Sequence, residues 1–194
     1  KEKFYILAGE SGCGKSTLSA FYASKGYKVI DCDKVAKDIR RFPECQQQLA
    51  EYFGEDIIFE GQIDTKLLSM RAFSTEEKLQ KLTDITHPFI EAEIVRQAEE
   101  AFAKGDEIVF VDGAVIIGHR VEKHCNKFIV VVVDFEKQCQ RLMKRDAITY
   151  EQAQTRVLKQ TPYSDMLKKA DYVINNNKGV QELILQGELV IRQL

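Results

Sequence analysis

Residues 9–16 read Gly-Glu-Ser-Gly-Cys-Gly-Lys-Ser, a pattern that matches the GxxxxGK(S/T) phosphate-binding loop. Glycine suits such a loop because, without a Cβ atom, successive backbone N–H groups can turn toward one phosphate. Lys15 would place its charge on the β- and γ-phosphate oxygens, and the hydroxyl of Ser16 would bind Mg²⁺. The pattern predicts a nucleotide site made of Gly9, Glu10, Ser11, Gly12, Cys13, Gly14, Lys15, Ser16 and Thr17.

The segments that flank this loop have the order that such a loop requires. Residues 4–8 are apolar and rich in aromatic side chains, which is typical of a short buried strand. Residues 16–25 place apolar side chains at helical spacing, and Gly26 follows as a helix stop. The N-terminus of that helix would direct its positive dipole end at the phosphates.

Two carboxylates, Asp31 and Asp33, lie at the end of the next apolar run, residues 27–31. In open α/β sheets ligands gather at the carboxyl ends of the strands, so both acids are expected beside the phosphate loop. One could accept a proton from a hydroxyl acceptor while the other orients water on Mg²⁺. The alternative is structural: one acid caps a helix and the other is solvated.

A third acid, Asp112, follows the apolar residues 108–111. An acid at the end of a buried strand is typical of a residue that orients the metal ion of a bound nucleotide. A plain strand end before a turn at Gly113 explains the same pattern. Asp112 is therefore a candidate for the metal site.

A basic helical stretch, residues 136–170, carries Arg141 and Arg145 one turn apart on one face. Arginines on a closing lid could stabilise the charge that spreads over the phosphate oxygens during phosphoryl transfer. A solvated basic face is the alternative. His87 precedes Pro88, and on its own this setting favours a structural residue at the start of a helix over a catalyst.

Short β-branched runs predict a sheet. Their continuous apolar character is typical of parallel strands that are buried on both faces. The runs are residues 4–8, 27–31, 108–112, 128–134 and 172–174. Helical patterns lie between them, with capping boxes that begin at Ser74 and Thr149 and a helix from Pro88 to Lys104. We predict an α/β protein with the three-layer P-loop NTPase fold and a five-stranded parallel sheet.

The uneven spacing of these runs predicts two additions to the fold. A largely helical stretch, about residues 35–105, is far longer than the dozen or so residues that a simple crossover needs. We expect this insertion to bind a second substrate, and residues 136–170 to form a helical lid. No linker or repeat marks a boundary, so residues 1–194 are expected to form a single domain.

The composition limits the partners and the location. A net charge of −2 argues against nucleic acid as the main partner. The five cysteines are odd in number and form no CxxC pair, which indicates reduced thiols. The chain shows neither an apolar run of membrane-spanning length nor a signal-peptide pattern. We expect a soluble, cytoplasmic protein, and the oligomeric state is left open.

Taken in order, these residues resemble the dephospho-CoA kinase family of P-loop small-molecule kinases. After the phosphate loop, the resemblance rests on Asp31-Cys32-Asp33, Phe53-Gly54, Ile63-Asp64 and His87-Pro88. It continues through Gln140-Arg141-Leu142, Arg145-Asp146, Arg156 with Gln160, and Ala170-Asp171-Tyr172-Val173-Ile174 with Asn176. The match therefore spans nearly the whole chain.

The resemblance implies transfer of the γ-phosphoryl group of ATP, with Mg²⁺, to the 3′-hydroxyl of the ribose in dephospho-CoA. The products would be CoA and ADP, in the last step of coenzyme A biosynthesis. The resemblance also implies that the second acid of the pair is the general base and that the lid arginines act on the transferred group. The predicted residues are Lys15, Asp33, Arg141 and Arg145 for catalysis, Asp33 and His87 for the acceptor, and Ser16, Asp31 and Asp112 for the metal.

The chain departs from the family's usual pattern in three places. Ala8, Glu10 and Ser11 replace a Thr, a Gly and an Ile at the phosphate loop. Residues 114–118 replace a stretch that usually carries an acid, and Thr65 stands where an Arg is common. These changes bear more on the acceptor than on the use of ATP.

Two other functions fit parts of the pattern. The first is another small-molecule kinase, of the shikimate, gluconate or nucleoside type. The second is a nucleotide switch or a non-catalytic ATP-binding protein. A GTPase switch is disfavoured because Asn126-Lys127 is followed by Phe128 and Ile129, so the Asn-Lys-x-Asp guanine motif is absent.

Overall fold

The structure is a computed structural model that describes residues 2–10, 12–113, 120–159 and 167–194. The chain forms two compact units. The sheet unit comprises Lys1–Ile30 and Glu100–Leu194, and the helical unit comprises Asp31–Glu99. The substrate-binding role that the sequence suggests for about residues 35–105 stays a prediction.

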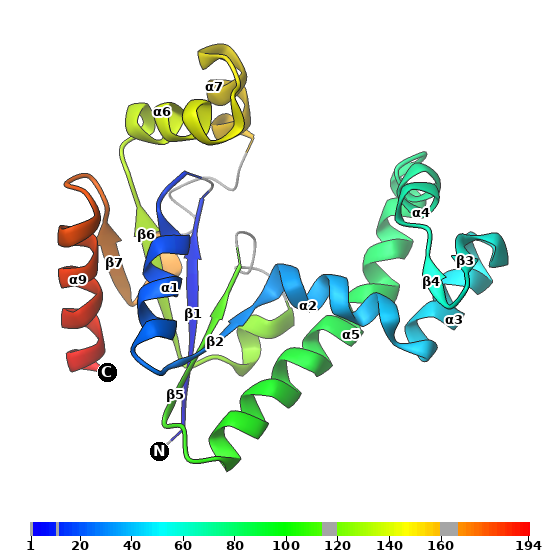
Figure 1. The fold of residues 1–194 in the computed structure, drawn as a ribbon, viewed down its shortest axis with the longest axis horizontal. Coiled ribbons are helices and arrows are strands. Elements are labelled where there is room, and N and C mark those ends of the chain that lie inside the picture. The colour runs from blue at the N-terminus through cyan, green and yellow to red at the C-terminus, as the bar shows by residue number, and fades with distance from the viewer. Residues whose placement is uncertain (1, 11, 114–119, 160–166) are drawn as a thin grey trace. The chain divides into compact units, whose positions relative to one another are not determined.

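Five strands form one parallel sheet, in the order β2-β5-β1-β6-β7 (Figure 1). They are β1 (Lys3–Gly9), β2 (Lys28–Asp31), β5 (Ile108–Asp112), β6 (Lys127–Val132) and β7 (Tyr172–Asn175). Each corresponds to a predicted apolar run, so the five-stranded parallel sheet is confirmed. The register pairs Leu7 with Asp112 and Gly9 with Val131, which brings the ends of β5 and β6 beside the end of β1.

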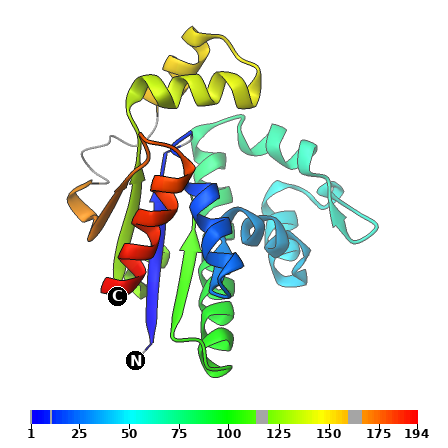
Figure 2. The same ribbon diagram turned by 60° about the vertical axis from the view of Figure 1, so that its left-hand side comes forward.

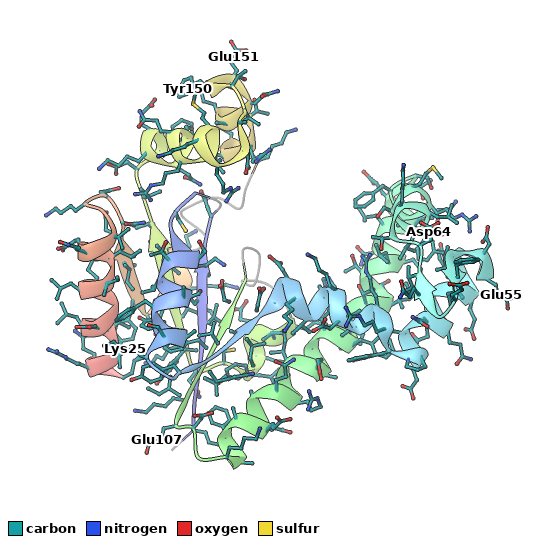
Figure 3. All side chains as sticks on the ribbon, viewed as in Figure 1. Lys25, Glu55, Asp64, Glu107, Tyr150 and Glu151 are labelled. Atoms are coloured by element: carbon teal, nitrogen blue, oxygen red, sulfur yellow. The ribbon has the colours of Figure 1, made fainter. Side chains whose placement is uncertain are left out.

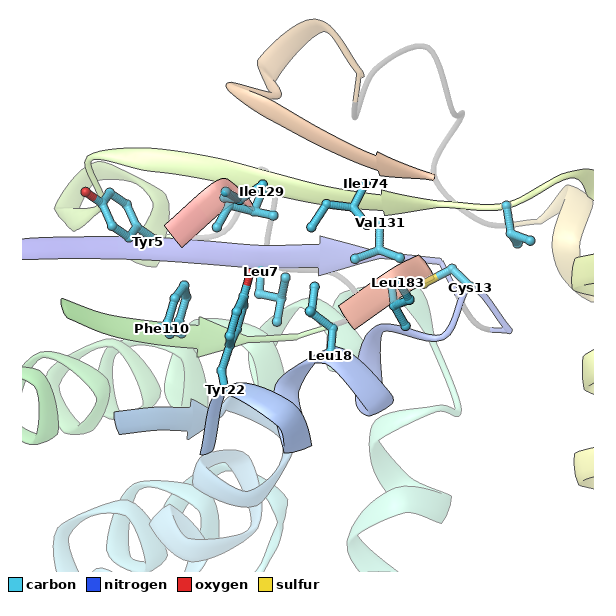
Figure 4. Close-up of a cluster of buried hydrophobic side chains, with 12 residues drawn as sticks. Tyr5, Leu7, Cys13, Leu18, Tyr22, Phe110, Ile129, Val131, Ile174 and Leu183 are labelled. Carbon is cyan, nitrogen blue, oxygen red and sulfur yellow. The ribbon is translucent and has the colours of Figure 1, made fainter. Parts of the chain in front are cut away.

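Two helices, α1 (Lys15–Ser24) and α9 (Val180–Gln193), lie side by side on one face of the sheet (Figure 2). The ring of Tyr22 on α1 stacks on Phe110 of β5 with 4.4 Å between the ring centroids. Its hydroxyl donates a hydrogen bond of 3.0 Å to the carbonyl of Gly187 on α9. Figure 4 shows Tyr22 and Leu18 directed at the side chains of the sheet, and burial of this large apolar surface anchors α1.

Side chains of the other sheet face pack against a second layer. Because neighbouring residues of a strand point to opposite faces, Phe4 lies on the face opposite Tyr5, where it meets Phe102 edge-on at 6.4 Å. Val130 and Val132 pack with Ala170 on one face of β6. Helical segments therefore cover both faces, and the predicted three-layer fold is confirmed.

Two helices follow β6, namely α6 (Phe135–Asp146) and α7 (Tyr150–Leu158). Thr149 accepts a hydrogen bond from the backbone N–H of Gln152, and the Gln152 side chain accepts one from the backbone N–H of Thr149, so the predicted capping box is confirmed. The two helices share a small apolar core. Tyr150, labelled in Figure 3, begins α7, and its hydroxyl donates to Glu136 at the start of α6. The core residues are Cys139, Leu142, Ala153 and Val157.

The helical unit begins at the end of β2. It contains α2 (Cys32–Asp38), η1 (Ile39–Arg41), α3 (Pro43–Phe53), η2 (Glu55–Ile57), β3 (Ile58–Phe59), β4 (Gln62–Ile63), α4 (Thr65–Ala72) and most of α5 (Glu76–Ala103). Strands β3 and β4 form a small antiparallel hairpin. Arg71 donates two hydrogen bonds of 2.6 Å to the carboxylate of Asp56 and another of 2.6 Å to the carbonyl of Phe53, which ties α4 to the end of α3.

Helix α5 differs from the prediction at its start. It begins at Glu76 and continues through Pro88, so the predicted helix start at Pro88 is wrong. The proline removes one backbone donor, but the helix continues on both sides of it. The N-cap is Thr75, whose hydroxyl accepts from the N–H of Lys78 at 3.1 Å, while Ser74 instead donates to Arg71 at 2.7 Å. The predicted Ser74 cap is therefore displaced by one residue.

The remaining part of the sheet unit is η3 (Arg120–His124), whose Val121 is buried. All five cysteines lie outside disulfide bonds. Among the helices that the structure describes, none combines the length and the apolar character that crossing a bilayer demands.

Candidate active site

The loop between β1 and α1 needs glycine at two positions where the backbone is left-handed. Gly12 has φ 82° and Gly14 has φ 91°, a region that residues with a Cβ atom rarely adopt. A Cβ on Gly12 would lie 2.9 Å from the carbonyl oxygen of Gln138, and a Cβ on Gly14 would collide with the amide of Asn176. Ser11, the remaining predicted loop residue, lies outside the described residues.

Helix α1 starts directly after this loop, with Gly14 as its N-cap. Glycine has no side chain that could occupy the first-turn N–H groups, so the positive end of the helix remains available to an anion. Ser16 and Thr17 lie in that first turn, and Ser16 is exposed. This arrangement suits the phosphates of a nucleotide.

Lys15 and Asp112 are brought together by the pairing of β1 with β5. The ammonium group of Lys15 donates to one carboxylate oxygen of Asp112, and the hydroxyl of Ser19 donates to the other at 2.6 Å. Both ionic side chains are largely buried, at 14% and 15% exposed. Ser19 was missed by the sequence analysis, although its position four residues after Lys15 puts it on the same helix face.

Arg141 reaches the phosphate loop from α6. Its guanidinium donates to the carbonyls of Cys13 at 3.3 Å, Gly12 at 3.4 Å and Asn176 at 2.9 Å. A positive charge therefore lies beside the loop, in addition to Lys15. The contacts also fix the middle of α6 against the loop.

Arg145 has different surroundings from Arg141. Its guanidinium donates to both carboxylate oxygens of Asp146, at 2.9 and 3.0 Å, and its side chain is 57% exposed. Asp146 also accepts from Arg156, and these hydrogen bonds lower the pKa of Asp146 to about 2. The structure thus places the two predicted lid arginines in unlike environments, and the catalytic role of each stays a prediction.

The turn after β7 also supports the loop, a role that the sequence analysis missed. Asn176 is buried, and its amide donates to the carbonyl of Cys13 at 2.8 Å. Asn177 exchanges two hydrogen bonds with Asp134, the residue before α6. The only sequence signal is the run of three asparagines at the end of the last strand, which does not show which carbonyl each amide contacts.

Two further loop side chains are shielded from water. The amide of Gln138 on α6 donates to Glu10 at 3.0 Å. Burial raises the pKa of Glu10 above its usual value, and this hydrogen bond opposes the shift only in part. Burial also raises the pKa of Cys13 to about 11, so its thiol is neutral near pH 7. A neutral, buried thiol is a poor nucleophile, and Cys13 serves the loop as a small apolar side chain.

The remaining predicted residues belong to the helical unit. Asp31 is the N-cap of α2, where it accepts from the N–H groups of Asp33 at 2.9 Å and Lys34 at 3.3 Å. Asp33 is exposed in the first turn of that helix. His87 is half-buried in the interior of α5, not at a helix start. Their roles toward metal, base chemistry and acceptor stay predictions.

The oxygen donors of this site fit Mg²⁺. The described residues contain no cluster of three or more acidic, histidine or cysteine side chains that would form a dedicated metal cage. Magnesium is instead commonly held by one or two protein oxygens together with water and phosphate oxygens. The Ser16 hydroxyl and the Asp112 carboxylate are hard oxygen donors of that kind.

The model of the family described as dephospho-CoA kinase matches residues 5–182. The chain belongs to the dephospho-CoA kinase family. A dephospho-CoA kinase from Fusobacterium nucleatum is 36% identical over 94% of the chain and 93% of that relative. The match favours this family over the other small-molecule kinases and the non-catalytic ATP-binding protein that fitted parts of the sequence.

Two solved structures of similar proteins share the fold of the chain. The crystal structure of TT1252 from Thermus thermophilus superposes with a TM-score of 0.80 at 25% identity and covers 100% of the chain and 98% of its own. Dephospho-CoA kinase from Campylobacter jejuni gives a TM-score of 0.68 at 27% identity, over 99% and 97% of the two chains. The kinase family predicted from the sequence is confirmed.

Proposed function

We propose that this member of the family transfers the γ-phosphoryl group of ATP to the 3′-hydroxyl of dephospho-CoA, giving CoA and ADP. The observation that carries the proposal is the position of Lys15 at the phosphate loop, held there by Asp112. Phosphoryl transfer spreads negative charge over the oxygens of the γ-phosphate, and a preorganised cation stabilises that charge. Family membership supplies the donor and the acceptor.

Several residues would bind the phosphate donor, ATP, together with its Mg²⁺ ion. The N–H groups of the loop and of the first turn of α1 would bind the phosphates, and Ser16 and Asp112 would hold Mg²⁺ together with Asp31. When bound, Mg²⁺ neutralises charge on the β- and γ-phosphate oxygens. Asp112 keeps the ammonium of Lys15 in place through a hydrogen bond. Arg141 adds a second cation next to the loop.

The acceptor side rests on residues of the helical unit. Asp33 would accept the proton of the ribose hydroxyl as that oxygen attacks the phosphorus, and His87 would contact the acceptor. The exposed carboxylate of Asp33 is open to a ligand. Residues 31–99 would thus supply the acceptor site. A small-molecule acceptor, no nucleic-acid partner and a cytoplasmic location complete the proposal.

The test is an ADP-release assay with ATP, Mg²⁺ and a panel of acceptors: dephospho-CoA, shikimate, gluconate and nucleosides. We expect turnover with dephospho-CoA to exceed that with every other acceptor, and mass spectrometry of the product to show CoA. Turnover with another acceptor and none with dephospho-CoA would refute the proposal. ADP release at the same rate with and without each acceptor would show that the protein only hydrolyses ATP.

Arg141→Ala is expected to lower kcat by about 10³-fold, the lower range for an arginine that stabilises a transferred phosphoryl group. Affinity for dephospho-CoA should change much less, because the charge develops only during transfer. Arg145→Ala should lower kcat by a smaller factor, since Asp146 holds its guanidinium. Arg141→Lys should rescue only partly, because an ammonium lacks the planar fork.

The control for this pair is Lys144→Ala, which removes an exposed charge from the same helix. Steady-state kinetics with dephospho-CoA as the varied substrate separate kcat from KM, and circular dichroism reports the fold. If both arginine variants match the Lys144 variant in kcat, neither arginine acts on the transferred group, and Arg141 only supports the loop.

A further inference from the structure

A hollow of about 1030 Å³ opens within the helical unit, between α2, η1, the β3–β4 turn and the start of α4. Three cations line it: Lys37 in the last turn of α2, and Arg40 and Arg41 in η1. We call this feature the basic hollow. Two carboxylates line the same hollow: Asp33, the predicted base, and Glu60 in the β3–β4 turn. Lys37 follows Asp33 by one helical turn, about 6 Å along the helix axis.

The three cations of the basic hollow have no carboxylate partner. Within the described part of the chain, neither Lys37, Arg40 nor Arg41 forms an ion pair. In contrast, Arg71 in the same unit is paired with Asp56 through two hydrogen bonds. The three unpaired cations outnumber the two carboxylates of the lining, and like charges that are close together repel one another, so the hollow favours an anion.

The backbone that carries these cations is anchored. The amide of Gln46 donates two hydrogen bonds of 2.9 Å, one to the carbonyl of Arg40 and one to that of Gly61 in the β3–β4 turn. These bonds join η1 to the opposite wall of the hollow. Ile39, the first residue of η1, and Cys45 on the following helix α3 are fully buried and hold η1 in the unit. The arginines therefore project from a fixed segment, which lowers the entropy cost of binding.

We propose that the basic hollow binds the diphosphate of the acceptor, with Arg40 and Arg41 as its main ligands and Lys37 as a third charge. This inference rests on the proposed function. The diphosphate of dephospho-CoA is attached to the 5′ carbon of the ribose whose 3′-hydroxyl must meet Asp33, so one hollow has to serve both groups. Guanidinium forks fit phosphate oxygens in a bidentate manner.

The test compares Arg40→Gln and Arg41→Gln with Lys34→Gln, which removes an exposed charge of α2 that does not line the hollow. We expect each arginine variant to raise the KM for dephospho-CoA roughly 10- to 100-fold, the range for a hydrogen bond to a charged group. The KM for ATP and kcat should stay within about twofold of the wild type, as should every constant of the Lys34 variant.

A binding measurement separates the diphosphate from the rest of the acceptor. Dephospho-CoA and adenosine are titrated by calorimetry into protein whose nucleotide site is filled with a non-hydrolysable ATP analogue. The arginine variants should weaken the binding of dephospho-CoA and leave that of adenosine unchanged, because adenosine has no diphosphate. An equal loss for both ligands, or no loss for dephospho-CoA, would overturn the inference.

The outcome also separates this inference from the proposed function. A wild-type protein that does not phosphorylate dephospho-CoA would refute the proposed function, and the calorimetry would still decide whether the hollow binds a diphosphate. Suppose that the wild-type protein turns over normally and the arginine variants cannot be distinguished from the Lys34 variant. That result would refute the diphosphate role of the basic hollow and leave the proposed function standing. Thermal unfolding is expected to be unchanged in all three variants, since the substituted groups form no ion pair.

Discussion

Lys15→Ala is expected to reduce kcat by about 10³-fold or more while the protein remains folded. A single preorganised donor at a developing oxyanion is worth about 10²- to 10³-fold, and a cation on a transferred phosphoryl group can be worth more. Lys15 is such a cation, because its ammonium is fixed by Asp112 in a largely buried setting. The measurement is the rate of CoA formation at saturating ATP and dephospho-CoA.

The structure adds a control for this prediction. Loss of Lys15 leaves the Asp112 carboxylate with the Ser19 hydroxyl as its donor, and a shielded charge without its counter-ion is unfavourable. Lys15→Ala should therefore melt at a lower temperature than the wild type. The double variant Lys15→Ala/Asp112→Asn should recover part of that stability and none of the activity. Lys25→Ala, at the exposed end of the same helix, should leave the activity unchanged.

Wild-type turnover in a folded Lys15→Ala protein would remove the assignment of residues 9–16 as the catalytic phosphate loop. A double variant that regained turnover would show that the carboxylate, rather than the missing ammonium, had blocked the reaction. Either result would make Arg141 the candidate for the cation that stabilises the γ-phosphate.

The elements around the loop were predictable from local sequence because their signals are local. The runs that became β1 and β5 are short, apolar and ended by glycine or aspartate, so both type and position followed from the pattern. In the structure the parallel pairing of β1 with β5 puts Asp112 in register with Leu7, and the carboxylate is then within reach of Lys15. The family resemblance rests on the same residues.

Other features depend on long-range contacts that no local pattern contains. Asn176 and Cys13 are 163 residues apart, and their hydrogen bond exists only once β7 has joined the sheet. The environment of Arg145 depends in the same way on Arg156 of α7, which shares Asp146. Pro88 misled the prediction because its preference for a helix start is only statistical, and here the helix already runs from Glu76.

Helix α9 was not predicted at all, although its apolar residues have helical spacing. Its position on the sheet depends on Gly187, where a Cβ would lie 2.5 Å from the side chain of Leu18 on α1. This close approach lets the carbonyl of Gly187 accept from Tyr22. A glycine inside a helix lowers local helix propensity, and only the packed structure shows why it is there.

Asp33→Asn is expected to lower kcat by about 10²-fold or more and to leave the affinities for ATP and dephospho-CoA close to those of the wild type. A positioned base contributes roughly 10²- to 10⁴-fold, and its proton acceptance is needed only while the hydroxyl attacks. Asparagine keeps the shape of the side chain but cannot accept that proton. The measurements are kcat across a Mg²⁺ titration and both affinities by calorimetry.

Asp31→Asn is the matched variant, two residues away, and it separates a metal role from a structural one. Asn is as good an N-cap as Asp, so the hydrogen bonds to the N–H groups of Asp33 and Lys34 should survive and α2 should stay intact. If Asp31 orients metal-bound water, this variant should need more Mg²⁺ and regain most of its turnover at saturation. If it behaves like the wild type at every Mg²⁺ concentration, Asp31 is only a helix cap. Normal turnover in Asp33→Asn would likewise show that the exposed acid is solvated and that another group, or none, takes the proton.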